Sequence, residues 1–248
     1  MIKQVYLQCL RYPQLRKPLR LFRAKLQSFS GYTDAFYNLA EIAAASDVRL
    51  FLDIGCHHGE TLLRFIESGI QCPIAAFDPF DENIEKAKRL LQPYPRINFY
   101  QLALSNTNGR ARFYLNKNEQ TSSLLANDTG NLDSFADDTA LVGSCEVQTR
   151  TLDSWAAEQG VSGPCIIKCD TQGAEGLVIE GGKSFIREHC VAFYGEVMLG
   201  DMYKGQRSFG DIRNLLEKDC GLALKNIYPC LHDKAGRAVQ MDALWVRL

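Results

Sequence analysis

The chain has 248 residues, of which 46% are hydrophobic and 23% charged, and its formal net charge is −1. This composition excludes disordered, fibrous and coiled-coil proteins, and the length is sufficient for one domain with a sizeable core. The longest run without a charged residue, 97–109, is too short and too polar for the ~20 apolar residues of a membrane-spanning helix.

Basic and acidic residues are distributed unevenly along the chain. Residues 1–33 contain seven basic side chains and no acidic one, so the other 21 basic and 29 acidic residues leave the remainder at −8. An acidic body of this kind argues against a nucleic-acid partner, because a nucleic-acid interface normally needs a basic stripe.

Residues 1–47 are predicted to form a basic N-terminal segment of short helices. Leu15, Leu19, Phe22 and Leu26 recur at helical spacing and define an apolar stripe among the basic side chains. Two interpretations remain open for this segment. Its stripe packs against the core or against a second copy in a homodimer, or the segment makes weak contact with an anionic membrane surface.

Cysteine usage and the N-terminal residues predict a cytoplasmic protein. The nine cysteines are scattered and none forms a CxxC pair, which argues against a zinc ribbon or a thioredoxin-like site. An odd number of unpatterned cysteines is typical of a reducing compartment. Pro13, Pro18 and the basic residues interrupt the N-terminal region, so we expect no signal peptide.

From residue 48 to residue 248, strand-length apolar runs alternate with segments of helical period. This alternation is typical of an α/β domain with a mostly parallel sheet. Strands are predicted at 50–54, 74–77, 97–104, 165–170 and 191–196, with an extra strand at 111–115. Residues 127–145 are polar and acidic and are predicted to form an inserted loop. Residues 224–228 and 243–246 are predicted to close the chain as an antiparallel hairpin.

The most informative segment is Asp53-Ile54-Gly55-Cys56-His57-His58-Gly59, directly after the first predicted strand. A carboxylate at the strand end and two glycines four residues apart predict a tight turn where a ligand approaches the backbone. The helix that follows offers unpaired N–H groups to such a ligand. The turn lacks the G-x-G-x-x-G spacing of dinucleotide-binding folds, so a nicotinamide cofactor is disfavoured.

Asp78 ends the second predicted strand, 25 residues after Asp53. A carboxylate at this place can accept hydrogen bonds from the hydroxyls of a ribose. The alternative is that Asp78 caps a helix ahead of Pro79. The residue viewed in isolation supports both interpretations equally.

These segments together resemble the FkbM-type family of class I S-adenosylmethionine-dependent methyltransferases. The resemblance runs from Phe51 to Leu248, and its most specific block is Ile167-Lys168-Cys169-Asp170-Thr171-Gln172-Gly173-Ala174-Glu175. It implies a single Rossmann-like domain, in which N-terminal helices precede a mostly parallel seven-stranded sheet with a C-terminal antiparallel hairpin. The family usually has Glu at positions 78 and 172 and Ala-Asn at positions 56 and 57, so this chain departs from it there.

The resemblance also implies roles for individual residues around S-adenosylmethionine. The methionine part would contact Asp53, Gly55 and Gly59, the ribose Asp78, and the adenine Leu102, Ala103 and Leu104. Cys56, His57, His58 and Pro79 are further candidates for cofactor binding, with one of the two histidines at the cofactor carboxylate or serving as an acid or base. Asp170 would face both the sulfonium end of the cofactor and the methyl acceptor. Ser122, Ser123 and Gln172 would lie near the acceptor.

Transfer of a methyl group to a hydroxyl benefits from a general base, typically by ~10²–10⁴-fold. The candidates are carboxylates at strand ends, in the order Asp170, Glu196, Glu175. Each of the last two also has a non-catalytic interpretation. Glu175 could be an acid in the first turn of a helix, where the helix dipole favours it, and Glu196 an ordinary acid at a strand end. His57 and His58 are adjacent on a turn and no third ligand can be placed, so no metal site is predicted.

The predicted function is O-methylation of a small hydroxylated acceptor, which the resemblance implies to be a sugar, a glycan precursor or a natural product. Asp170-Thr171-Gln172-Gly173 stands where amino-methylating enzymes of nucleic acids carry Asn/Asp-Pro-Pro-Tyr, which disfavours a DNA or RNA substrate. Two alternatives remain. A non-catalytic S-adenosylmethionine-binding protein would hold the cofactor without turnover, and an NAD-dependent oxidoreductase would need a third glycine after Gly59.

Overall fold

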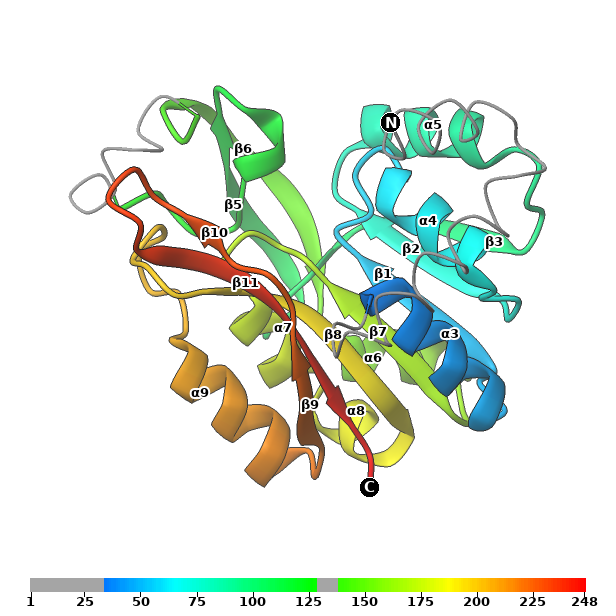
Figure 1. The fold of residues 1–248 in the computed structure, drawn as a ribbon. Coiled ribbons are helices and arrows are strands. Elements are labelled where there is room, and N and C mark those ends of the chain that lie inside the picture. Colours follow the sequence, from blue (N-terminus) through cyan, green and yellow to red (C-terminus); the bar gives the residue numbers. More distant parts are fainter. Residues whose placement is uncertain (1–33, 129–137) are drawn as a thin grey trace, which may run out of the picture.

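The structure is a computed structural model that describes residues 34–128 and 138–248. Its parallel strands are β1 (Leu50–Ile54), β2 (Ile74–Asp78), β3 (Ile97–Gln101), β7 (Cys165–Cys169) and β8 (Cys190–Met198). The C-terminal strands are β9 (Ala223–Ile227), β10 (Leu231–His232) and β11 (Ala238–Val246). Within the described residues these eight strands form one sheet of order β10-β11-β8-β7-β1-β2-β3, with β9 also paired to β11 (Figure 1).

This sheet confirms the mostly parallel α/β architecture expected from the sequence. The predicted hairpin is also confirmed, because β9 and β11 pair in antiparallel register. Since β11 pairs with β8 along one side, β9 and the two-residue strand β10 share its other side. The sheet is therefore seven strands wide, as predicted, although eight strands contribute to it.

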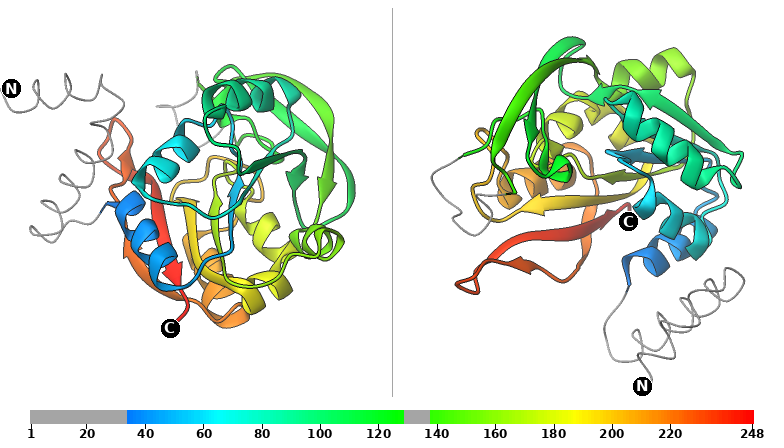
Figure 2. Two further views of the ribbon diagram at one scale, coloured as in Figure 1. Left: turned by 90° about the vertical axis from the view of Figure 1, so that its right-hand side faces the viewer. Right: turned by 90° about the horizontal axis from the view of Figure 1, so that it is seen from above.

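Helices cover both faces of the sheet (Figures 1 and 2). One face carries α3 (Ala35–Ala45), α4 (Glu60–Ser68) and α5 (Asp81–Leu91). The other carries α6 (Leu152–Gln159), α7 (Glu175–Gly181), α8 (Lys183–His189) and α9 (Phe209–Asn214), which continues into the π-helical turn η2 (Leu215–Asp219). Successive side chains of each strand point to opposite faces of the sheet, so each strand contributes to a hydrophobic core on both faces. Phe51 and Ile166 pack under α4, whereas Leu52 and Ile167 pack with α6 and α7.

A second, three-stranded sheet corrects two of the predictions. It consists of β4 (Ala103–Leu104), β5 (Gly109–Asn116) and β6 (Leu141–Arg150), with the short 3-10 helix η1 (Glu119–Thr121) after β5. The predicted strand 97–104 is therefore two strands in different sheets. The predicted loop 127–145 contains the start of β6. Leu141 and Val142 are exposed there, so this part of the strand lacks the buried apolar run by which the other strands could be predicted. Residues 129–137 of that loop lie outside the described residues.

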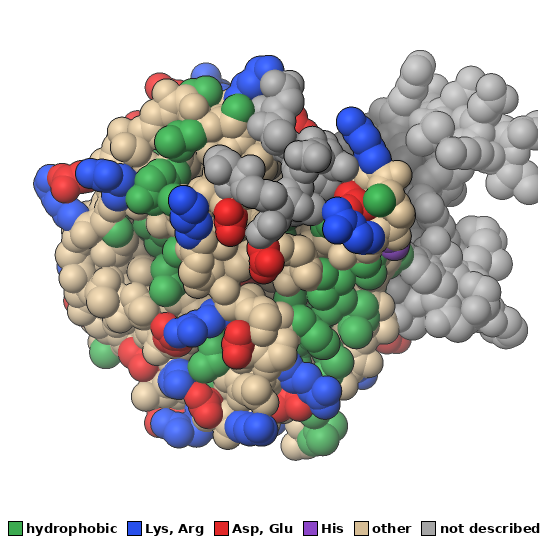
Figure 3. Space-filling view, turned by 90° about the vertical axis from the view of Figure 1, so that its left-hand side faces the viewer, with side chains coloured by type: hydrophobic (Ala, Val, Ile, Leu, Met, Phe, Trp, Pro, Cys, Tyr) green, Lys and Arg blue, Asp and Glu red, His purple; other side chains and the backbone are tan. Residues whose placement is uncertain are grey.

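Helix α3, at the end of the predicted N-terminal segment, packs onto the sheet. Phe36 lies 4.5 Å from Phe65 of α4, measured between ring centroids, and the Asn38 amide donates to the Tyr228 hydroxyl at 2.8 Å. The stripe predicted between Leu15 and Leu26 lies outside the described residues. Basic and acidic side chains are interspersed over the face that carries α9 (Figure 3). Among the helices of residues 34–128 and 138–248, none has the length and apolar character needed to span a bilayer.

Candidate active site

The carboxyl ends of β1, β2 and β7 meet at one edge of the sheet, beside a cavity of about 730 Å³. Its wall includes the turn after β1, the end of β2, residues 102–104, η1 and the segment after β7. Ligands of open α/β sheets bind at this edge. The cavity therefore brings together most of the residues that the sequence singled out for a cofactor.

Gly55 shapes the turn between β1 and α4. Its φ is +79°, and a Cβ atom on it would lie 1.9 Å from the carbonyl oxygen of Asp170. Glycine is therefore required both by the left-handed backbone and by the close approach of the end of β7. His57 also has a positive φ, of 46°, in a region where Asn, Asp and His are enriched. His in place of the family's Asn is thus compatible with the turn.

Asp78 is a buried carboxylate that lines the cavity. It accepts hydrogen bonds from the N–H groups of His57 (3.1 Å) and Phe80 (3.0 Å) and from the amide of Asn83 (3.1 Å). Burial raises the pKa of Asp78, and these donors oppose that rise. An ionised carboxylate accepts about four hydrogen bonds, so one position remains for a ligand hydroxyl. Asp78 does not cap α5, since Phe80 occupies the N-cap position.

Lys168 is a buried cation that connects β7 to the turn. Its ammonium lies 3.0 Å from Asp53 Oδ1 and 3.7 Å from Asp170 Oδ2, and it donates to the Gly55 carbonyl at 2.8 Å. Burial lowers the pKa of Lys168, but Asp53 and Asp170 outweigh burial and raise that pKa above its usual range. Asp53 itself is fully buried and does not line the cavity. Its charge acts on the cavity through Lys168, which sequence reasoning did not name as a site residue.

Asp170, Gln172 and Glu196 form a hydrogen-bonded cluster in the cavity wall. The Gln172 amide donates to Asp170 Oδ1 at 3.1 Å and to Glu196 Oε2 at 2.7 Å. The Tyr203 hydroxyl donates to Gln172 Oε1 at 3.1 Å, and the Gln240 amide donates to Glu196 Oε1. The structure thus brings three predicted residues together and adds Tyr203 and Gln240, which sequence reasoning missed.

The remaining predicted residues divide between the cavity wall and its surroundings. The wall includes Cys56, His57, Pro79, Leu102, Ala103, Leu104 and Ser122. His58 and Gly59 lie outside it, and Ser123 is buried behind it, with its hydroxyl donating to the Thr171 carbonyl at 3.4 Å. The apolar side chains at 102 and 104 suit a flat heterocycle, whereas Ser123 has no path to a ligand in this arrangement.

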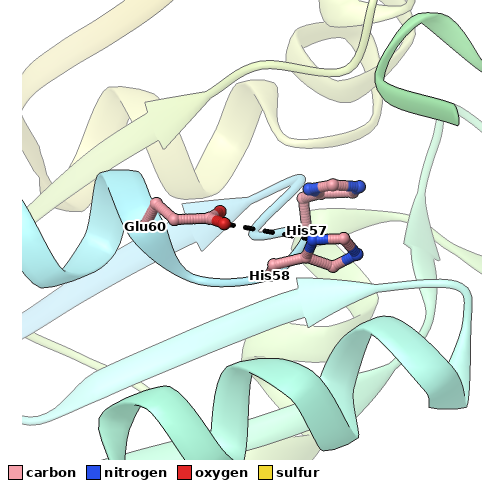
Figure 4. Close-up of side chains that lie close together, drawn as sticks. All are labelled: His57, His58 and Glu60. Atoms are coloured by element: carbon pink, nitrogen blue, oxygen red, sulfur yellow. Dashed lines mark ion pairs between the residues drawn. The ribbon is translucent and has the colours of Figure 1, made fainter. Parts of the chain in front are cut away.

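His57 and His58 stack with 3.6 Å between ring centroids, and Glu60 lies beside them (Figure 4). One ligand atom from each of the three falls within 4.8 Å of the others, a spacing that could hold a metal ion. However, the Lys86 ammonium lies 3.0 Å from His58 Nε2, and Glu119 Oε1 lies 3.3 Å from the same nitrogen. The Lys86 ammonium thus places a cation beside this cluster, and the absence of a metal there stays a prediction.

The family model of the methyltransferase FkbM domain matches residues 53–222 of this chain. The chain belongs to the FkbM methyltransferase family. The 2-O-methyltransferase NoeI of Sinorhizobium fredii is 28% identical over 173 residues, which cover 67% of this chain and 70% of that protein. The crystal structure of methyltransferase FkbM from Methylobacillus flagellatus shares the fold, with a TM-score of 0.50 and 17% identity over 81% of this chain. The match spans only 44% of that chain.

A second cavity of about 310 Å³ adjoins the first in this FkbM methyltransferase. Lys168, Asp170, Glu196 and Gln240 line both cavities. The rest of its wall is mostly polar and comes from α3, α4, β8, β11 and the end of β9, with the polar side chains of Asp34, Arg64, Tyr194, Tyr228 and Asp242. The carboxylates of Asp170 and Glu196 therefore stand where two spaces meet, one large enough for a cofactor and one suited to a small polar molecule.

Glu175, the third candidate base, lies outside both cavities of this FkbM methyltransferase. It is buried at the start of α7, and its Oε1 accepts from the N–H of Thr171 at 2.7 Å and from the Thr171 hydroxyl at 3.0 Å. These bonds fix the segment after β7. Burial raises the pKa of Glu175 to about 7, although the Thr171 donors oppose that rise.

Glu175→Gln is expected to stabilise the protein at pH 8 by about 1–3 kcal/mol. Because the folded-state pKa of Glu175 is above its unfolded value, its contribution to stability is complete below pH 4.5 and is lost as the pH rises through about 7. Gln keeps an oxygen that accepts from Thr171 and carries no charge. Urea unfolding at pH 5 and pH 8 measures this, and an equal stability of both proteins at pH 8 would contradict the expectation.

Proposed function

We propose that this methyltransferase transfers the methyl group of S-adenosylmethionine to a hydroxyl oxygen of a small molecule, either a sugar or glycan precursor or a natural product. The observation that carries the proposal is one cavity wall that contains Asp78, the apolar residues 102–104 and the paired carboxylates of Asp170 and Glu196. The 2-O-methyltransferase named among its relatives supports oxygen as the acceptor atom.

The residues present fit S-adenosylmethionine. A volume of about 730 Å³ lies within the range of cofactor sites. Leu102 and Leu104 offer apolar contacts for the adenine, and Asp78 keeps one acceptor position for a ribose hydroxyl. The acids around Lys168 outnumber it, so this part of the wall complements a ligand that carries positive charge.

When bound, S-adenosylmethionine supplies an activated methyl group, so the protein has to align the acceptor, exclude water and accept a proton. Asp78 and residues 102–104 hold the nucleoside. The Tyr203 hydroxyl donates to the Thr121 carbonyl at 2.8 Å and so fixes η1 over the cavity, which limits the access of water. The acceptor enters the second cavity, where its hydroxyl proton passes to a carboxylate oxygen of the Asp170–Glu196 cluster.

The two alternative functions have less support. An NAD-dependent oxidoreductase is disfavoured by Glu60, which begins α4 at the position where a dinucleotide-binding fold has its third glycine. Glu60 lines the cavity, so its negative charge would repel a pyrophosphate bound there. A non-catalytic binding protein would not need carboxylates between two cavities. It would bind S-adenosylmethionine without forming S-adenosylhomocysteine in the presence of hydroxylated acceptors.

Asp78→Ala is expected to weaken S-adenosylmethionine binding by about 10–100-fold, since it removes a charge-assisted hydrogen bond of ~1.5–3 kcal/mol. Calorimetric titration with S-adenosylmethionine, S-adenosylhomocysteine and NAD measures the affinities. Asp219→Ala is the matched control, because it removes an exposed carboxylate from η2, outside both cavities. Failure of the unmodified protein to bind either sulfur compound would contradict the proposed function, and binding of NAD alone would support the oxidoreductase.

A further inference from the structure

Glu196 is a buried carboxylate whose two oxygens face side-chain amides. Only 6% of the residue is exposed, and Gln172 and Gln240 each donate to one of its oxygens. Among the ion pairs within residues 34–128 and 138–248, none includes Glu196. An ionised carboxylate that is removed from water and has no cation in contact is in an unfavourable environment.

The charged groups that face Glu196 are mostly acids. They are Asp170 and Lys168 of β7 and the segment after it, Glu175 at the start of α7, and Asp242 of β11. Lys168 is the one cation among these, and its ammonium contacts Asp53, Gly55 and Asp170 instead. Arg64 of α4 and Asp34 line the second cavity together with Glu196 and add one charge of each sign to it. Burial raises the pKa of Glu196 well above its usual range. The negative charges of Asp170, Glu175 and Asp242 raise this pKa further, and the positive charge of Lys168 lowers it.

The two amides beside Glu196 differ in their freedom. Gln172 is fixed, because its nitrogen donates to Asp170 as well as to Glu196, and its oxygen shares the Tyr203 hydroxyl proton with the Thr121 carbonyl. Gln240 can rotate its amide by half a turn, so that its oxygen accepts a hydrogen bond from protonated Glu196 or its nitrogen donates one to the carboxylate. Both protonation states of Glu196 can therefore be hydrogen-bonded at this position.

We propose that Glu196 holds a proton in the free protein, and that the positive charge of S-adenosylmethionine releases this proton and so makes Glu196 the base that accepts the acceptor's hydroxyl proton. The inference rests on the proposed function and names its base. Asp170, which Lys168 faces, supplies negative charge but is not the group that exchanges the proton. S-adenosylhomocysteine has no sulfonium charge, so it leaves the proton on Glu196.

Proton release can be measured without knowing the acceptor. S-adenosylmethionine and S-adenosylhomocysteine are each titrated into the full chain at pH 7 in buffers of different ionisation enthalpy, and the slope of the observed enthalpy counts the protons released. We expect S-adenosylmethionine to release up to one proton more than S-adenosylhomocysteine. Glu196→Gln is expected to bind both compounds and to abolish this difference. Glu196→Gln also serves as the control for the ligands' own amino and carboxylate groups, because their protons contribute equally to the unmodified protein and to the variant.

The unmodified protein provides a second readout that does not depend on the variant folding. Release of a proton on binding means that the affinity for S-adenosylmethionine, relative to that for S-adenosylhomocysteine, rises with pH by up to tenfold per unit. A pH-independent ratio of the two affinities, or equal proton release by both compounds, would overturn the proposal. Failure to bind S-adenosylmethionine at all would instead overturn the proposed function.

Discussion

Lys168→Met is expected to lower the free energy of unfolding by about 3–5 kcal/mol, because it leaves the carboxylate of Asp53 buried without its partner. For a chain of this size that loss corresponds to a fall in Tm of about 6–20 °C. Met has nearly the volume of Lys, so the change tests the charge and not the packing. Thermal unfolding followed by circular dichroism measures it, and a Tm within about 2 °C of the unmodified protein would contradict the expectation.

A double substitution separates the ion pair from other effects of Lys168. Asp53→Asn combined with Lys168→Met removes both charges, so we expect it to recover more than half of the stability that the single variant loses. The Gly55 carbonyl loses its donor in either case. If the double variant is stable but binds S-adenosylmethionine weakly, Lys168 also orders the turn after β1. Equal instability of the single and double variants would show that the Asp53 pair is not the source of the loss.

The strands that position this site could be predicted because their sequences are short and mostly apolar on both faces. Residues 50–54 and 165–170 are bounded by turn signals, and their buried positions alternate between two helical layers. Gly55 could be identified as a close-approach position because a ligand-binding turn at a strand end needs a left-handed residue. The same argument located Asp78 and Asp170, since carboxyl ends of parallel strands meet at one edge.

The partners of Glu196 could not be predicted, because they depend on pairing between distant strands. Gln240 reaches Glu196 only through the antiparallel register of β11 with β8, and a shift of one residue would turn it to the opposite face. Tyr203 reaches Gln172 from the loop after β8, for which the sequence has no periodicity. Asp53 was predicted to contact the cofactor because it stands at the end of a strand, next to the glycine turn. In the structure, the alternation of side chains along β1 points the Asp53 carboxylate to Lys168, behind the cavity wall.

Glu196→Gln is expected to reduce kcat by about 10²–10⁴-fold and to leave the affinity for S-adenosylmethionine within a few-fold, because a neutral amide cannot accept the hydroxyl proton. Methyl transfer from radiolabelled S-adenosylmethionine measures kcat, with the hydroxylated acceptor that a screen against this protein identifies. Gln is the conservative choice, since it keeps an oxygen for the Gln172 amide. The kcat of the unmodified protein should rise with pH as Glu196 ionises, and this rise should be absent from the variant.

Asp170→Asn is the comparison that decides between the two carboxylates. Asp170 lies between the Lys168 ammonium and the Gln172 amide, so we expect its amide variant to lose less kcat than Glu196→Gln and to keep a pH-dependent rate. Removing the Asp170 charge also removes one of the groups that hold the proton on Glu196, and the pH at which kcat rises should therefore move downward. A larger loss of kcat in Asp170→Asn, together with near-normal methylation by Glu196→Gln, would make Asp170 the base and Glu196 a buried acid that only supports it.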